Sequence, residues 1–371
     1  MSFDEPLFNI HLNVDFPFNL TGVLYFPKIK PNVEPQRNKI QLFQKQVFVT
    51  DSVEGIVPDF LTLLHGVIDS PDIPLNVSRS YLQADGNVKK ISSHITKKVA
   101  DKLDEMFRKD REDFESKWND MKIIIEYGML TEDKFFDKAK KFALYEDTEG
   151  KLHTFDAYLE SIKENQTDKD KKTVVLYASH KDGQHSYIQA AKAKGYQVLL
   201  LDSPLTSHLI QKLEGEHKDT TFARVDSDLI DNLIKKDETR VAKLSEKQKE
   251  ELKTRLEAIV PKEKFTLKLE DMDSTEAPLV ITVPEFMRRM KEMQMTGGGG
   301  MMGMSDFPEM YDLVVNANHS LASKILDTDD EVARSTAVNQ ALDLAKLQQN
   351  LLHGEELTAF IARSYEMLGD E

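Results

Sequence analysis

Apolar and polar residues alternate along the first part of the chain in the way that half-buried β-strands require. This alternation predicts a hairpin over residues 7 to 27 and a further strand over residues 41 to 49, packed against helices. Over residues 88 to 121 the apolar positions recur at helical spacing instead, which predicts one long charged helix. We expect Trp118, the single tryptophan, to pack on the core.

Two unbroken apolar runs follow, TVVLYAS at residues 173–179 and YQVLLLD at residues 196–202. Such runs are typical of parallel strands that are covered on both faces. The segment between them predicts a crossover helix that ends at Gly195, because glycine readily adopts the left-handed conformation of a C-cap. The pattern therefore predicts a small βαβ unit.

A βαβ unit resembles a mononucleotide fold, so a nucleotide- or metal-dependent enzyme built on residues 173–202 is the alternative interpretation. The turn after the first strand, HKDGQHS, has one glycine in place of the three that a pyrophosphate-binding turn needs. His180, Asp182 and His185 lie in this turn and are conceivable metal ligands. Histidines scattered through a polar loop are more often solvated, so we expect no metal site.

Residues 235–259 are almost wholly charged and predict a solvated helix at a domain boundary. Strand-like alternation returns over residues 265–283, and the remainder reads as helical apart from one glycine run. The mixture of strands and helices along the chain predicts an α/β (α+β) fold in several parts.

Seven of the fourteen methionines gather between residues 287 and 304. The first three repeat at every third residue, opposite Arg288, Arg289 and Lys291, and four glycines then interrupt the helix. Methionine side chains are flexible and polarizable, so this methionine segment suits a surface that accepts many apolar partners. A core-facing helix followed by a loop is the alternative. The candidate binding residues are Met287, Met290, Met293, Met295, Met301, Met302 and Met304.

The last two predicted helices carry broad apolar faces on either side of His353 and Gly354. A hairpin of such helices exposes much apolar surface, and pairing with the same hairpin of a second copy gives a symmetric four-helix bundle. The alternative is that the helices fold back on their own domain. We expect a homodimer, with the candidate interface residues Leu344, Leu347, Leu351, Leu357, Phe360, Ile361, Tyr365 and Leu368.

Composition narrows the possible partners and compartments. The 371 residues suffice for two or three domains, and 49 basic against 64 acidic residues give a net charge of −15. This charge makes nucleic acid an unsuitable partner, and no apolar run approaches the roughly 20 residues that span a bilayer. The absence of cysteine excludes disulfides and thiolate metal sites and fits a reducing compartment.

One arginine, Arg79, stands near the end of a proline-stiffened segment, DSPDIPLNVSRSYLQ, at residues 69–83. Asn76 or Ser78 can cap a following helix, which would place Arg79 in its first turn and Gln83 one turn further on the same face. An arginine held in this way suits a phosphate, because its planar fork stays charged and contacts two oxygens at once. An ordinary surface arginine beside a helix cap is the alternative.

The run from Asn38 to Gln83 contains LFQKQVFVTD, VPDFL and GVIDSPDIPLNVSR in succession. It resembles the middle domain of the heat-shock protein 90 chaperones, most closely the bacterial HtpG type, and the resemblance continues to the C-terminus. It implies a catalytic role for Arg79 at the γ-phosphate of ATP, supported by Gln83, with Asn76 as a further polar residue of the loop. It also implies that the methionine segment holds non-native client proteins and that the terminal helices form the constitutive dimer.

The resemblance divides the chain into three parts: the large α/β part of a middle domain (1–145), its small α-β-α part (146–235) and a C-terminal dimerisation domain (236–371). The sequence starts directly with the middle-domain hairpin, so we expect the ATP-binding N-terminal domain of the family to be absent. We therefore expect this chain alone to bind no cofactor and to hydrolyse no ATP, whereas the full-length chaperone uses ATP and Mg²⁺. The C-terminus lacks the tail of the eukaryotic cytosolic members, which favours a bacterial, cytoplasmic protein.

Overall fold

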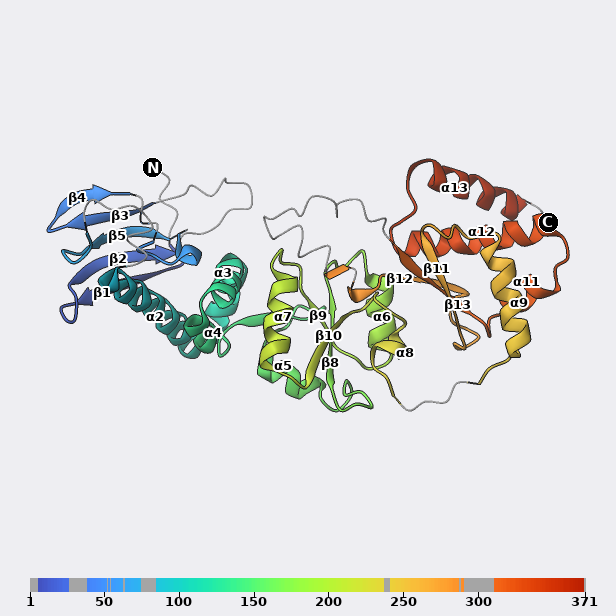
Figure 1. The fold of residues 1–371 in the computed structure, drawn as a ribbon, viewed down its shortest axis with the longest axis horizontal. Coiled ribbons are helices and arrows are strands. Elements are labelled where there is room, and N and C mark those ends of the chain that lie inside the picture. The colour runs from blue at the N-terminus through green and yellow to red at the C-terminus, as the bar shows by residue number, and fades with distance from the viewer. Residues whose placement is uncertain are drawn as a thin grey trace. The chain divides into compact units, whose positions relative to one another are not determined.

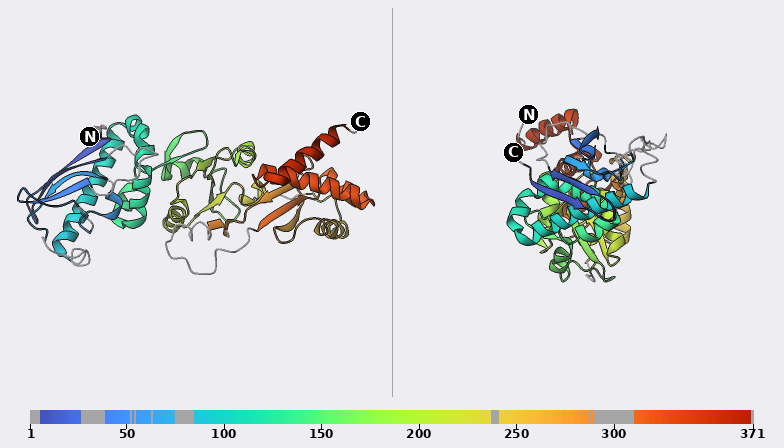
Figure 2. Two further views of the ribbon diagram at one scale, coloured as in Figure 1. Left: turned by 90° about the horizontal axis from the view of Figure 1, so that it is seen from above. Right: turned by 90° about the vertical axis from the view of Figure 1, so that its left-hand side faces the viewer.

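The chain divides into two compact units, one of residues 1–145 and 152–158 and the other of residues 146–151 and 159–371. Both units combine helices with small sheets, as Figures 1 and 2 show, which confirms the α/β fold class. The computed structural model describes residues 6–26, 39–51, 53, 55–62, 64–74, 85–236, 241–286, 288–289 and 310–369.

A five-stranded sheet with helices against it makes up most of the first unit (Figure 1). The strand order is β1-β2-β5-β3-β4, in which β3 and β5 are parallel and the other pairs are antiparallel. Buried and exposed residues alternate along β1, as the sequence pattern predicts. The elements are β1 (Phe8–Val14), β2 (Leu20–Phe26), β3 (Lys39–Gln44), β4 (Val47–Thr50), η1 (Asp59–Leu61), β5 (His65–Asp69), α2 (Gly86–Lys109), α3 (Arg111–Thr131), α4 (Asp133–Ala139), β6 (Leu144–Glu146), β7 (Leu152–Thr154) and the start of α5 (Phe155–Ile162).

Gly66 on β5 lies against the neighbouring strand β2. Its φ is +144°, and a Cβ added there would lie 2.0 Å from the carbonyl oxygen of Val23 on β2. Only glycine fits this position without moving a strand. Strand β5 leads directly into the segment that carries Arg79.

The single long helix predicted over residues 88 to 121 is wrong, because the chain forms two helices there. Asp110 is extended, with φ −148° and ψ 93°, and its carboxylate accepts a hydrogen bond from the Asp113 amide at 3.0 Å. One residue thus ends α2 and caps α3. Trp118 on α3 is buried in the core, as predicted.

The second unit begins with a three-stranded parallel sheet in the order β10-β8-β9, flanked by helices on both sides (Figure 1). The predicted βαβ unit is confirmed, and Gly195 has the left-handed φ of +76° that ends α6. The third strand, β10, was missed from the sequence. The elements are β8 (Thr173–Ala178), α6 (His185–Ala193), β9 (Val198–Leu200), α7 (Thr206–Glu216), β10 (Thr220–Arg224) and α8 (Ile230–Leu233).

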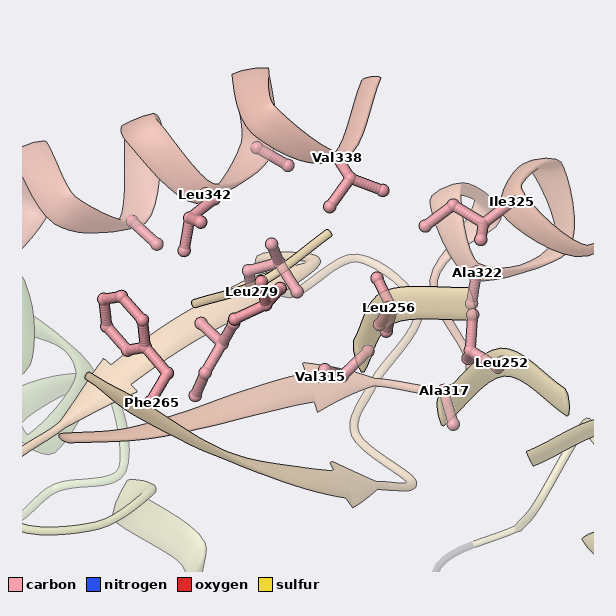
Figure 3. Close-up of a cluster of buried hydrophobic side chains, with 14 of the residues drawn as sticks. Leu252, Leu256, Phe265, Leu279, Val315, Ala317, Ala322, Ile325, Val338 and Leu342 are labelled. Atoms are coloured by element: carbon pink, nitrogen blue, oxygen red, sulfur yellow. The ribbon is translucent and has the colours of Figure 1, made fainter. Parts of the chain in front are cut away.

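A second three-stranded sheet, in the order β11-β13-β12, carries the rest of the unit. Helices α9, α11 and α12 direct apolar side chains onto it, and Figure 3 shows Leu342 and Val338 of α12 facing Leu279 of β12. These side chains form one continuous core. The elements are α9 (Glu246–Glu257), β11 (Phe265–Glu270), β12 (Leu279–Thr282), β13 (Tyr311–Asn316), α11 (Ser320–Asp327), α12 (Glu331–Gln348) and α13 (Gly354–Gly369).

The charged segment over residues 235–259, predicted as a solvated helix, is helical over Glu246–Glu257, and this helix is not fully solvated. Helix α9 starts with a capping box in which Ser245 and Gln248 bond each other's backbone amides. Leu252 and Leu256 on its inner side are fully buried in the C-terminal core. Two leucines among many charges are therefore enough to fix this helix on the sheet.

Candidate functional site

Helix α12 has two apolar faces, and only one of them is covered by the part of the chain that the structure describes. Val338, Leu342 and Ala345 lie at helical spacing and are buried on the C-terminal sheet. Leu344 and Leu347 point away from that core, and each is exposed over more than two fifths of its surface. The outward face of α12 is therefore an apolar surface without a covering element among the described residues.

Helix α13 is held beside α12 mainly by polar side chains. Arg363 donates to Gln340 at 2.8 Å and to the Asp343 carboxylate at 2.5 Å, and Gln340 donates to Ser364 at 3.0 Å. Lys346 on α12 adds an ion pair at 3.3 Å to the carboxylate of Glu356. These contacts hold α13 beside α12 through polar side chains.

The predicted interface residues occupy three different environments on this hairpin. Phe360 is buried, and Leu351 and Leu357 are half-buried. Five others form an exposed set that we call the hairpin face: Leu344 and Leu347 on α12 and Ile361, Tyr365 and Leu368 on α13. Tyr365 is 71% exposed and Leu368 is 79% exposed, so α13 does not bury its apolar side on its own domain.

An open groove of about 460 Å³ lies beside the hairpin face. It is lined by Glu331, Val332, Ser335, Thr336 and Asn339 of α12 and by Arg363 of α13. Val332 is the apolar residue of this lining and is 75% exposed, whereas the other lining residues are polar.

The predicted phosphate-contacting residues Arg79, Gln83 and Asn76 lie outside the described residues, but both ends of their segment are described. On the β5 side, the Gln44 amide donates to the carbonyls of Pro71 and Ile73 at 3.1 and 3.3 Å. The Asp72 carboxylate accepts from the Asn19 amide at 2.6 Å. These bonds fix the entry to the segment against β2 and β3.

The exit from the same segment is fixed by the cap of α2. Asp85 accepts hydrogen bonds from the amides of Asn87 and Val88 at 2.8 and 3.1 Å. The buried apolar stripe of α2, which includes Ile91 and Ile95, packs in the core of the first unit.

The candidate binding residues of the methionine segment, Met287, Met290, Met293, Met295, Met301, Met302 and Met304, also lie outside the described residues. The helical turn that leads into them is described at Glu285, Phe286, Arg288 and Arg289. Arg288 is only 7% exposed, whereas the sequence pattern placed it on a polar face opposite the methionines. This burial could not be predicted from the sequence, because one partner of Arg288, Tyr177, lies far away in the chain on the βαβ unit.

Glu285 is the centre of that contact. Its Oε1 accepts hydrogen bonds from the Tyr177 hydroxyl at 2.9 Å and from Arg288 and Arg289 at 2.6 Å each. Burial favours the neutral acid, but Arg288 and Arg289 and the hydrogen bonds of Arg289 and Tyr177 outweigh it and lower the pKa of Glu285. Burial and the Glu285 charge raise the pKa of Tyr177, so its hydroxyl stays a donor.

Two amides of the turn after β8 are bonded within the chain. The Oε1 of Gln184 accepts hydrogen bonds from the backbone amides of Ser179 and His180 at 2.8 and 3.0 Å. Phosphate-binding turns of mononucleotide folds present backbone amides to the ligand. The side chain of Gln184 therefore takes up two donors of this turn.

Within the described ranges, no three His, Asp or Glu side chains gather so as to hold a metal ion, and His180, Asp182 and His185 form no such group. No helix in the same ranges is both long enough and apolar enough to cross a membrane.

Comparison with known proteins identifies the class to which this architecture belongs. A family model described as Hsp90 protein matches residues 1–368. A protein named Chaperone protein HtpG from Bacteroides thetaiotaomicron is 46% identical over 98% of this chain and 63% of its own length. A protein of the same name from Porphyromonas gingivalis is 52% identical over 93% of this chain and 51% of its own length.

The chain belongs to the Hsp90 protein family. This confirms the resemblance to the bacterial HtpG type that the loop sequence indicates. A more distant relative with the same name, from Geobacter sulfurreducens, is 31% identical over 57% of this chain. The chain spans between half and two thirds of the length of the first two relatives, so the activity of the whole protein is a matter for proposal.

Proposed function

We propose that this chain is the client-binding and dimerising part of an ATP-dependent chaperone of the heat-shock protein 90 type, acting in the bacterial cytoplasm. Family membership and the names of the relatives support the chaperone class. The single observation that carries dimerisation is the hairpin face, because five large apolar side chains are left exposed above a core that is already complete. The chain would pair with a second copy through this face.

In this proposal ATP and Mg²⁺ bind to the N-terminal domain of the family, and this chain contributes Arg79. The guanidinium of Arg79 would stabilise charge on the γ-phosphate when the two domains close, with Gln83 and Asn76 supporting it. The hydrogen bonds at Ile73 and Asp85 support this role, because a segment held at both ends has less freedom to lose on contact with the phosphate.

The enzyme alternative built on residues 173–202 is not proposed, because two observations oppose it. Gln184 accepts hydrogen bonds from the amides of Ser179 and His180 in the turn after β8. The carboxyl end of the sheet, where open α/β folds bind their ligands, is in contact with Ile281 and Val283 of the same chain, through Tyr187 and Asp226.

The methionine segment is proposed to hold clients, and a quadruple change to serine at Met290, Met293, Met301 and Met302 tests this. We expect weaker suppression of the aggregation of an unfolded substrate, with stability nearly unchanged, since exposed side chains typically contribute within about 0.5 kcal/mol. Aggregation and thermal melting would be measured on the same variant.

Met121→Ser serves as the matched control, because Met121 is fully buried on α3. Truncating a buried methionine costs roughly 2 to 5 kcal/mol, so this variant should melt at a clearly lower temperature. If the quadruple variant shows a comparable drop, the methionines belong to a core, and the client-site proposal is wrong.

A further inference from the structure

The unpaired side of β10, the outer strand of the β10-β8-β9 sheet, is bonded by a segment of the chain's own C-terminal part. Tyr177 and Arg224 are register partners near the ends of the parallel strands β8 and β10. Glu285 contacts both of them, accepting from the Tyr177 hydroxyl at 2.9 Å and from the Arg224 amide at 3.2 Å. The backbone of β10 on the side away from β8 therefore receives a carboxylate that follows β12 in sequence.

Arg289 makes the second set of contacts at this edge. Its guanidinium donates to the Glu214 carboxylate on α7 at 2.9 and 3.3 Å and to the carbonyl of Phe222 on β10 at 2.8 Å. The same side chain also donates to Glu285 at 2.6 Å. A planar arginine fork that satisfies two carboxylates and a carbonyl together is a specific junction rather than a loose surface pair.

Further hydrogen bonds continue the junction toward β12. The Val283 amide donates to the Asp226 carbonyl at 2.8 Å. The carbonyl of Ile281 on β12 accepts from the Tyr187 hydroxyl of α6 at 2.7 Å and from Gln349, next to the end of α12, at 3.2 Å. Strand β12 is thus hydrogen-bonded at Ile281 both to the βαβ unit and to the residue that follows α12.

We propose that Glu285 and Arg289 are positioning residues that seat the chain leading into the methionine segment on the βαβ unit. The seat consists of Glu285 and Arg289 on one side and Tyr177, Glu214, Phe222 and Arg224 on the other. The described residues at the start of the methionine segment are thus bonded to the βαβ unit and follow directly from β12 of the C-terminal sheet. The part of this inference that concerns client holding rests on the proposed function.

Arg289→Ala in the full chain tests the seat, with amide hydrogen exchange as the first measurement. We expect exchange in the peptides containing Arg224 and Val283 to rise about 10-fold or more, which corresponds to about 1.4 kcal/mol of local protection. Amides of β13 should keep their protection. Glu214→Gln, which removes the charge that pairs with Arg289 but keeps an oxygen for the Phe222 amide, should produce a smaller rise at the same peptides.

Arg255→Ala is the matched control. Arg255 also bonds one carboxylate and two carbonyls, those of Glu251, Ile325 and Thr328, but it lies within the C-terminal part, away from the seat. Its replacement should leave exchange at Arg224 and Val283 unchanged. Equal exchange in the Arg289→Ala variant and the wild type would overturn the seat.

The aggregation assay provides the second measurement. We expect Arg289→Ala to weaken client holding although every methionine is intact, and Arg255→Ala to leave it near the wild-type level. Faster exchange at the seat together with unchanged holding would overturn the positioning role. Failure of the wild type to hold clients would contradict the proposed function instead, and the seat would then be decided by the exchange data alone.

Discussion

Replacing Leu344 and Tyr365 by aspartate should turn a dimeric chain into a monomer. In a symmetric dimer each change occurs twice, so four apolar contacts worth about 1.5 to 3 kcal/mol each would be lost, and four charges would enter an apolar interface. We therefore expect Kd to rise by more than about 1,000-fold, which corresponds to about 4 kcal/mol. Light scattering at micromolar concentration measures the change in mass.

The design of this experiment follows from the two faces of α12. Deleting residues 336 to 371 would also remove Val338 and Leu342, which fill the C-terminal core, whereas Leu344 and Tyr365 point outward. The parent should stay dimeric even at about 1 M salt, because apolar contacts are little screened. Val241→Asp is the control, since Val241 is 81% exposed but lies outside the hairpin. A double variant that remains dimeric would refute the proposed interface.

Arg79→Ala should produce the second large effect, in a protein that joins this chain to an ATP-binding domain of the family. We expect kcat for ATP hydrolysis to fall by about 10-fold or more, with little change in ATP affinity. An arginine finger can supply a factor of roughly 10³ where chemistry limits the rate, and less where domain closure does. Steady-state hydrolysis and a nucleotide-binding titration on the same variant separate the two effects.

Arg108→Ala provides the comparison for this experiment. Arg108 lies on α2 in the same unit, is exposed and pairs with Asp104 at 2.7 Å. Its removal should change neither turnover nor affinity, because surface ion pairs typically contribute at most about 1 kcal/mol. Unchanged turnover in Arg79→Ala would remove the catalytic assignment while leaving the family membership intact.

The local pattern of apolar, polar and glycine residues was sufficient to predict much of the fold. The apolar runs at residues 173–179 and 196–202 define β8 and β9 because parallel strands covered on both faces need apolar side chains on both. Gly195 ends α6 because its left-handed φ suits glycine. The break at Asp110 was missed, since one extended residue hardly disturbs the helical spacing of apolar positions around it.

The seat could not be predicted, because its contacts join residues far apart in the chain. Tyr177 and Glu285 are separated by 108 positions, and Arg289 and Glu214 by 75. The sequence pattern shows only that Arg288 and Arg289 are charged, and a charged residue usually lies in solvent. The hairpin face, in contrast, could be predicted from the sequence, because broad apolar faces on two terminal helices already indicate a missing partner. Arg79, Gln83, Asn76 and the methionines stay predictions.

Suppression of aggregation by this chain alone tests the central claim most directly. A chemically unfolded protein would be diluted into buffer with and without the chain, in the presence and absence of ATP and Mg²⁺, while light scattering and phosphate release are recorded. We expect the chain to lower light scattering to the same extent with and without ATP and to release no phosphate. Scattering that the chain does not lower, or phosphate release by the chain itself, would contradict the central claim.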